Sequence, residues 1–271
     1  MSLVKKSCSI MKIDYTIRQL SPYINWDYFF FAWGMHGKPQ AERQHLRDEA
    51  DGVLRELDSR YHAHGVFRLF DAHSEGDDVV LPDCRLPFLR QQRPDTDCLC
   101  LSDFISPKAD RIGVFATTVD MGLETDFDAD PYQKMMVQLL ADRLAEAAAE
   151  CMHEEVRKTH WGYAPDEQLT MQQLHAECFQ GIRPAVGYPS LPDTSFNFLI
   201  DRLLDLRQLG IRLTENGAMK PHASVSGLMI AHPKARYFAV GTIGDDQLAD
   251  YASRRGLPVA LMRKYLSANL N

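Results

Sequence analysis

The chain has 271 residues, and 30 Lys and Arg against 37 Asp and Glu give it a formal net charge of −7. Hydrophobic residues at 45% and charged residues at 25% are typical of a globular protein and exclude a wholly disordered chain. The acidic balance argues against a general nucleic-acid binder, because phosphate contacts need clustered Lys and Arg. No apolar run approaches the roughly 20 residues of a membrane helix. We therefore expect neither nucleic acid nor membrane as a partner.

The cysteines favour a reducing compartment. The C-x-x-C spacing of common zinc sites does not occur, and the opening residues lack the apolar segment of a secretory signal. We interpret all six cysteines as reduced thiols of a cytoplasmic protein: Cys8, Cys84, Cys98, Cys100, Cys151 and Cys178. Residues 1–12 are expected to form a flexible tail before a single domain over residues 13–271.

The N-terminal half predicts one helix and three strands, over residues 41–61, 66–70, 79–81 and 111–117. Between the first two strands, residues 71–76 match D-x-H-x-x-G, by which some proteins bind the cobalt of cobalamin through the histidine, here His73. That chemistry requires a doubly wound α/β fold, whereas the strand that follows Gly76 here favours a hairpin turn. The turn is the preferred interpretation.

The clearest helix signal begins at Asp130, because Asp is a good N-cap and Pro131 fits the first helical position. Apolar residues at helical spacing predict a helix to about His160, long enough to cross the whole domain. Within it, His153 begins a sequence like the zinc-protease H-E-x-x-H, but Arg157 replaces the second histidine. We therefore expect a solvated helix face and no metal site.

The C-terminal half alternates turns, helices and strands. The capping-box pair Thr170 and Gln173 predicts a short helix to about residue 180, and the prolines and glycines of residues 181–193 predict a stiff, extended loop. Further elements are a helix from residue 193 or 194 to Gly210, hairpin strands over 223–231 and 236–243, a helix capped by Asp245 and ending at Gly256, and a last helix from Pro258. Hairpin strands mixed with long helices predict an α+β domain with a largely antiparallel sheet.

The loop over residues 181–193 is also a candidate binding site. Its prolines pre-set the backbone, Gly187 permits a ligand to approach the main chain, and Tyr188 offers a ring face. Arg183 offers a planar fork for a carboxylate. A structural connection with Arg183 in an internal salt bridge explains the same residues equally well, and spacing alone leaves both interpretations open.

The loop sequence RPAVGYP, followed by PD at residues 192–193, resembles the signature of the activation domain of cobalamin-dependent methionine synthase. Other segments support the resemblance in the same order along the chain: residues 24–33 (INWDYFFFAW), 141–146 (ADRLAE), 161–165 (WGYAP) and 223–227 (ASVSG). The similarity runs from about residue 24 to the C-terminus.

The resemblance implies a single C-shaped domain with a twisted antiparallel sheet. It also implies a reactivation module that binds S-adenosylmethionine and supports reductive methylation of cob(II)alamin in methionine biosynthesis. Cobalamin would enter only through a partner, the cobalamin-binding synthase core, and flavodoxin or a flavoprotein reductase would supply the electron. The chain would hold neither a catalytic residue nor a metal ligand of its own.

The resemblance also assigns a ligand site. Its members are Asn25, Arg183, Ala185, Gly187, Tyr188, Tyr237 and Phe238, with Glu146 and Glu177 as second-rank candidates. Arg183 would anchor the methionine carboxylate, and Tyr188 and Tyr237 would pack against the adenosyl and sulfonium groups. Two positions depart from the family pattern: Asn25 replaces Asp, and Thr194 replaces His.

These departures motivate an alternative, an interaction scaffold that docks on a cobalamin-binding partner without binding S-adenosylmethionine. A direct cobalamin carrier through His73 is the third hypothesis.

Overall fold

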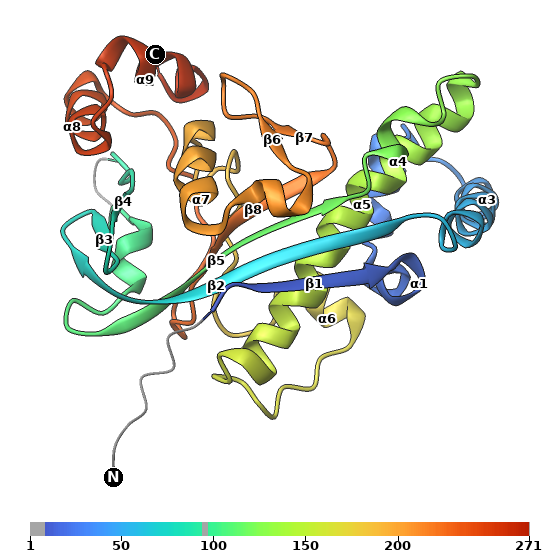
Figure 1. Ribbon diagram of the computed structural model, residues 1–271, viewed down its shortest axis with the longest axis horizontal. Coiled ribbons are helices and arrows are strands. Elements are labelled where there is room, and N and C mark those ends of the chain that lie inside the picture. The colour runs from blue at the N-terminus through green and yellow to red at the C-terminus, as the bar shows by residue number, and fades with distance from the viewer. Residues whose placement is uncertain (1–8, 94–96, 271) are drawn as a thin grey trace.

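The computed structural model describes residues 9–93 and 97–270, which form a curled antiparallel sheet with helices on both faces (Figure 1). The strand order is β4-β3-β2-β5-β8, and β1 pairs with the first half of the long strand β2. The six strands are β1 (Met11–Thr16), β2 (His62–Glu75), β3 (Asp78–Val80), β4 (Arg85–Pro87), β5 (Asp110–Val119) and β8 (Ser224–Met229). A separate hairpin joins β6 (Arg212–Leu213) to β7 (Met219–Lys220).

The described helices differ widely in length. The longest, α5, runs across the sheet and packs against β2, β5 and β8 (Figure 1). The helices are α1 (Ile17–Leu20), α2 (Trp26–Ala32), α3 (Gln40–Leu57), α4 (Gly122–Thr125), α5 (Pro131–Glu155), α6 (Met171–His175), α7 (Asn197–Leu204), α8 (Asp245–Arg255) and α9 (Val259–Tyr265). None of these described helices is long and apolar enough to cross a membrane.

Side-chain alternation along the central strand β5 explains why the sheet is covered on both faces. Val114 and Ala116 point into a core that contains α7, whereas Phe115 and Val119 point toward cores that contain α5. Because both faces are apolar, each must bury its side chains against helices. The α+β class with a largely antiparallel sheet and long helices, expected from the sequence, is confirmed.

Local signals place several helix ends correctly. Asp130 accepts hydrogen bonds from the first backbone N–H groups of α5, and Thr170 and Gln173 form the predicted capping box of α6. The α-helix of α5 ends at Glu155, and a π-helical turn, Val156–His160, continues it to the predicted end. Helix α6 is shorter than predicted and stops at His175.

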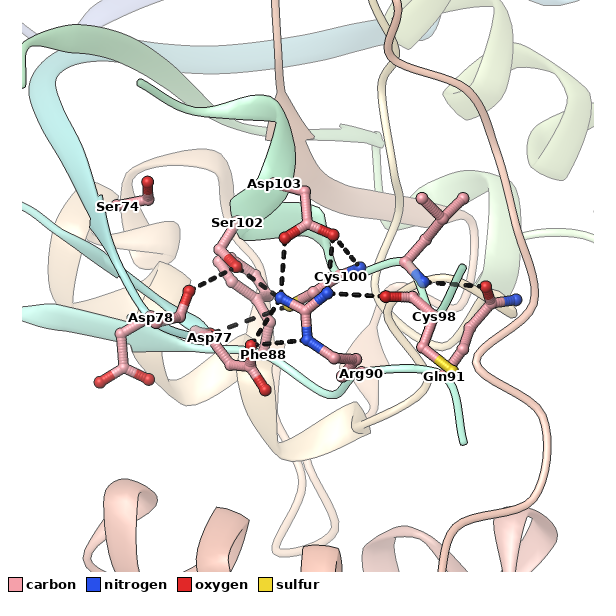
Figure 2. A network of polar contacts seen from close by, with 12 residues as sticks. Ser74, Asp77, Asp78, Phe88, Arg90, Gln91, Cys98, Cys100, Ser102 and Asp103 are labelled. Carbon is pink, nitrogen blue, oxygen red and sulfur yellow. Dashed lines mark hydrogen bonds and ion pairs between the residues drawn. The ribbon is translucent and has the colours of Figure 1, made fainter. Parts of the chain in front are cut away.

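The predicted hairpin turn between β2 and β3 is formed by Gly76 and Asp77, while residues 71–75 of the D-x-H-x-x-G segment belong to β2. Gly76 has a φ of +60°, which favours glycine, and its carbonyl accepts a hydrogen bond from Ser102 at 2.9 Å. Figure 2 shows the neighbouring network, in which Arg90 donates to Asp77 at 2.8 Å and to both carboxylate oxygens of Asp103 at 2.7 and 2.8 Å. Hydrogen bonds and ion pairs within the chain therefore hold this turn in place.

The predicted second hairpin strand, residues 236–243, is wrong: the segment forms no strand and does not pair in a sheet. Residues of the Pro/Gly loop already occupy the free edge of β8. Val186 donates to the carbonyl of Ser226 and Leu228 donates to that of Pro184, at 2.9 and 3.0 Å. With the edge filled, the segment instead runs beside the loop, where Val240 donates to the Pro189 carbonyl at 2.8 Å.

The predicted N-terminal tail, residues 1–12, extends too far along the chain. Met11 and Lys12 belong to β1, where they pair with Phe67 and Val66, because the exposed edge of β2 offers them backbone partners. Residues 1–8, including Cys8, lie outside the described residues. Helix α8 also differs in its cap, since Gly244 and not Asp245 precedes its first residue.

Candidate functional site

A cavity of about 590 Å³ opens between the middle of α5, the Pro/Gly loop and residues 237–239. Its size is typical of a site for a small organic ligand. Eight of the nine candidate residues line it: Asn25, Glu146, Glu177, Arg183, Ala185, Tyr188, Tyr237 and Phe238. Residues far apart in the sequence therefore meet at one cavity.

One face of α5 supplies charged residues to the cavity wall. Arg143, Glu146, Ala147 and Glu150 follow one another at helical spacing, so their side chains share a face. Both oxygens of the Glu146 carboxylate lie 3.3–3.4 Å from the guanidinium nitrogens of Arg143. Glu146 also accepts a hydrogen bond from the hydroxyl of Tyr188 at 3.0 Å, which links helix and loop across the cavity.

Close contact with β8 fixes the opposite wall. Ile182 exchanges two backbone hydrogen bonds with Ile230, both 2.9 Å, and Ala185 forms a bridge with Gly227. A Cβ atom at Gly227 would lie only 2.2 Å from the carbonyl oxygen of Pro184. Only glycine therefore allows the loop to lie this near to the strand.

Arg183 lies at the wall with its side chain 13% exposed. Its backbone N–H donates to the hydroxyl of Tyr237 at 2.9 Å, and its guanidinium donates to the carbonyl of Ala149 and to the carboxylate of Glu150. Burial opposes the charge, but the Glu150 carboxylate raises the pKa of Arg183 above its ordinary value. Arg183 thus makes the internal ion pair that one sequence-based interpretation expects, and it also lines a cavity; its binding of a ligand stays a prediction.

Aromatic rings complete the wall. Burial raises the pKa of both Tyr188 and Tyr237 to about 12, so each hydroxyl is protonated at neutral pH and can donate a hydrogen bond. Phe238 lines the cavity and also contacts Phe104, with 6.5 Å between ring centroids. These rings offer flat apolar surfaces beside the charged groups of α5.

Two candidates behave differently from the prediction. Gly187 does not belong to the cavity wall; its φ of +88° and its N–H bond to the Leu191 carbonyl make it a turn residue. Asn25 does line the cavity, but its side-chain oxygen accepts a hydrogen bond from the N–H of Asp27 as the N-cap of α2. This oxygen is therefore already engaged in local structure.

Glu177 stands at the cavity in a left-handed conformation, with a φ of 56° that is unfavourable for a residue other than glycine. Burial, followed by the charge of Glu150, raises the pKa of its carboxyl. Strained residues of this kind gather at functional sites. The geometry supports keeping Glu177 as a candidate.

The predicted solvated face around His153 is wrong. His153 and Arg157 are both fully buried, and Arg157 pairs with Glu167 at 2.6 Å. Burial, aided by the charges of Arg183 and Arg157, lowers the pKa of His153 well below its ordinary value. Among the described residues, no three His, Cys, Asp or Glu side chains form a group able to hold a metal ion.

Sequence reasoning missed several residues of the wall, above all Glu150, Arg143 and Tyr28. A signal was available for Glu150, because it lies four residues after the candidate Glu146 and therefore on the same helix face. No local signal identifies Tyr28, which reaches the cavity only through the packing of α2 on α5.

Fold and cavity together define an α+β domain with a charged, aromatic site for a small ligand. Residues 16–256 match the family described as vitamin B12 dependent methionine synthase, activation domain. A crystal structure of the MetH reactivation domain bound to AdoHcy is 38% identical with a TM-score of 0.93, and the match covers 98% of this chain and 91% of that one.

This chain therefore belongs to the activation-domain family of vitamin B12-dependent methionine synthase. The resemblance seen in the sequence is confirmed.

Proposed function

We propose that the cavity binds S-adenosylmethionine and that the chain serves as a reactivation module for the reductive methylation of cob(II)alamin. The main support is the cavity itself, in a chain 38% identical to a domain bound to AdoHcy. Three carboxylates and two guanidinium groups line its wall: Glu146, Glu150, Glu177, Arg143 and Arg183. This net negative wall suits a ligand with a sulfonium, an ammonium and one carboxylate.

The residues of the chain would bind and orient the methyl donor. Arg183 would donate to the ligand carboxylate, while Tyr188 and Tyr237 would pack against the sulfonium and adenosyl groups. The partner's cobalamin supplies the nucleophile when bound, so this chain need not provide a catalytic base. Its contribution would be proximity, which holds the methyl group in a fixed position and orientation.

An exposed apolar surface beside the cavity supports docking of a cobalamin-binding partner. Tyr28 lines both the cavity and a second hollow of about 450 Å³, and this hollow also includes Phe30, Phe31 and Met35. Tyr28 is 59% exposed and Phe31 is 71% exposed. Large apolar side chains exposed together are typical of interaction sites.

Two finer expectations stay predictions. The electron donor would be a flavodoxin or a flavoprotein reductase, and the chain would work in the cytoplasm.

Isothermal titration with S-adenosylmethionine tests the binding proposal. Replacing Arg183 by Ala should weaken binding by about 1.5–3 kcal/mol, the loss expected for a charge-assisted hydrogen bond. Arg111→Ala removes the same charge at a half-exposed position of β5 and should leave binding unchanged. Equal affinities for all three proteins would exclude Arg183 from ligand binding.

One observation favours the alternative of a scaffold that binds no S-adenosylmethionine. The side-chain oxygen of Asn25 is engaged in capping α2, and its amide carries no charge for the ligand ammonium. A thermal shift separates the two functions, because a ligand of the folded state must raise the melting temperature. An unchanged melting temperature at millimolar S-adenosylmethionine would support the scaffold.

A further inference from the structure

The ion pair between Arg183 and Glu150, two residues that line the cavity, includes an unused hydrogen-bond acceptor. One carboxylate oxygen of Glu150 accepts from the guanidinium of Arg183, but the other is buried and has no hydrogen-bond partner in the structure. A buried carboxylate oxygen without a partner is costly, so a bound group that donates a hydrogen bond to it would remove that cost. The side chain of Glu150 is 18% exposed and lines the cavity.

The other polar groups of the wall are less suited to receive a cation. Both oxygens of Glu146 contact Arg143, and one also accepts from Tyr188. The oxygen of Asn25 caps α2. Glu177 is more exposed than Glu150, so water screens its charge more.

Arg183 has further N–H groups that can donate hydrogen bonds to a ligand while it is paired with Glu150. A guanidinium has five N–H donors, and the contacts to Ala149 and Glu150 use one on each terminal nitrogen. A carboxylate and an ammonium joined to one carbon present opposite charges side by side. The pair of Arg183 and Glu150 presents the complementary charges in the same manner.

We propose that Arg183 and Glu150 together recognise the zwitterionic amino-acid end of the ligand, with Glu150 accepting hydrogen bonds from the α-ammonium group. The inference rests on the proposed binding of S-adenosylmethionine and adds to it a specificity residue. Glu150 thereby supplies the negative charge that Asn25 lacks.

Titrations with three ligands test this role: S-adenosylmethionine, S-adenosylhomocysteine, and 5′-methylthioadenosine, which lacks the amino-acid end. Glu150→Gln keeps the shape of the side chain and removes its charge. It should weaken binding of the first two ligands by about tenfold to a hundredfold, as expected for a lost charge-assisted hydrogen bond. Binding of 5′-methylthioadenosine, followed by NMR at millimolar concentration, should not change.

Glu56→Gln is the matched control, because it removes the same charge from the exposed face of α3. It should leave all three affinities unchanged. If Glu150→Gln does not fold, Glu150→Asp is used, which keeps the charge but shortens its reach; it should weaken only the two ligands with an amino-acid end.

The outcomes separate the two proposals. If the unaltered chain does not bind S-adenosylmethionine, the proposed function fails and this inference fails with it. If the unaltered chain binds but the Glu150 variant loses affinity for all three ligands equally, or for none, the proposed function stands. In that case Glu150 has no role in recognising the amino-acid end.

Discussion

Two buried arginine–carboxylate pairs in this chain differ in how completely their hydrogen bonds are satisfied. In the pair between Arg255 and Asp193, one carboxylate oxygen accepts from Tyr251 and Arg255, and the other accepts from the N–H and hydroxyl of Ser195. In the pair between Arg183 and Glu150, one carboxylate oxygen has no partner.

This difference indicates a structural role for the first pair and a ligand-binding role for the second. The saturated pair joins α8 to the end of the Pro/Gly loop, where Asp193 is 1% exposed, and leaves nothing for a ligand. The unsaturated pair lies at the other end of the loop and faces the cavity. A polar group left partly unsatisfied in a protein interior is destabilising unless a ligand completes it.

The largest expected effect is on stability, at the saturated pair. Arg255→Leu leaves Asp193 buried without its charge partner and should lower the free energy of unfolding by about 3–5 kcal/mol. Arg183→Leu should cost less, because Glu150 borders a cavity that water can enter. Urea unfolding followed by circular dichroism measures both variants, and a larger loss for Arg183→Leu would reverse the comparison.

An intermediate effect is expected where the loop touches β8. Gly227→Ala places a Cβ atom against the carbonyl of Pro184, so the loop must move. We expect a loss of about 1–3 kcal/mol in the free energy of unfolding and weaker binding of S-adenosylmethionine, because the same loop carries Arg183.

Gly52→Ala is the control for this substitution. Its Cβ atom would meet nothing nearer than 3.8 Å, and alanine favours the helix α3 by about 1 kcal/mol. This variant should be more stable and bind normally. Unaltered binding by Gly227→Ala would show that the strand contact does not position the site.

The smallest effect is a pH dependence at Glu177. Burial and the charge of Glu150 raise the pKa of its carboxyl from the ordinary 4.5, so the ionised form makes the folded state less stable. Glu177→Gln should therefore raise the melting temperature at pH 7. The gain should disappear below about pH 4.5, where the carboxyl is protonated in both folded and unfolded states. An equal gain at every pH would mean that the carboxylate charge is not the cause.

Local hydrogen bonds explain what could be read from the sequence. The cap at Asp130 and the capping box of Thr170 and Gln173 each depend on contacts between residues at most three positions apart. The turn at Gly76 has a local signal of its own, the left-handed φ that favours glycine. The Pro/Gly loop is also a local property, since proline fixes its own backbone. The family signature in this loop then indicated most of the candidate site.

Contacts between residues far apart in the sequence explain which features of the structure could not be predicted from the sequence. The partner of Arg183 is Glu150, 33 residues earlier, and it is close only because α5 passes beside the loop. Residues 236–243 have the composition of a strand, but the loop competes successfully for the edge of β8. Only the tertiary structure decides which of two segments pairs with a strand edge. The outcome depends on which distant segment lies close enough to form the hydrogen bonds, and not on the strand propensity of either segment.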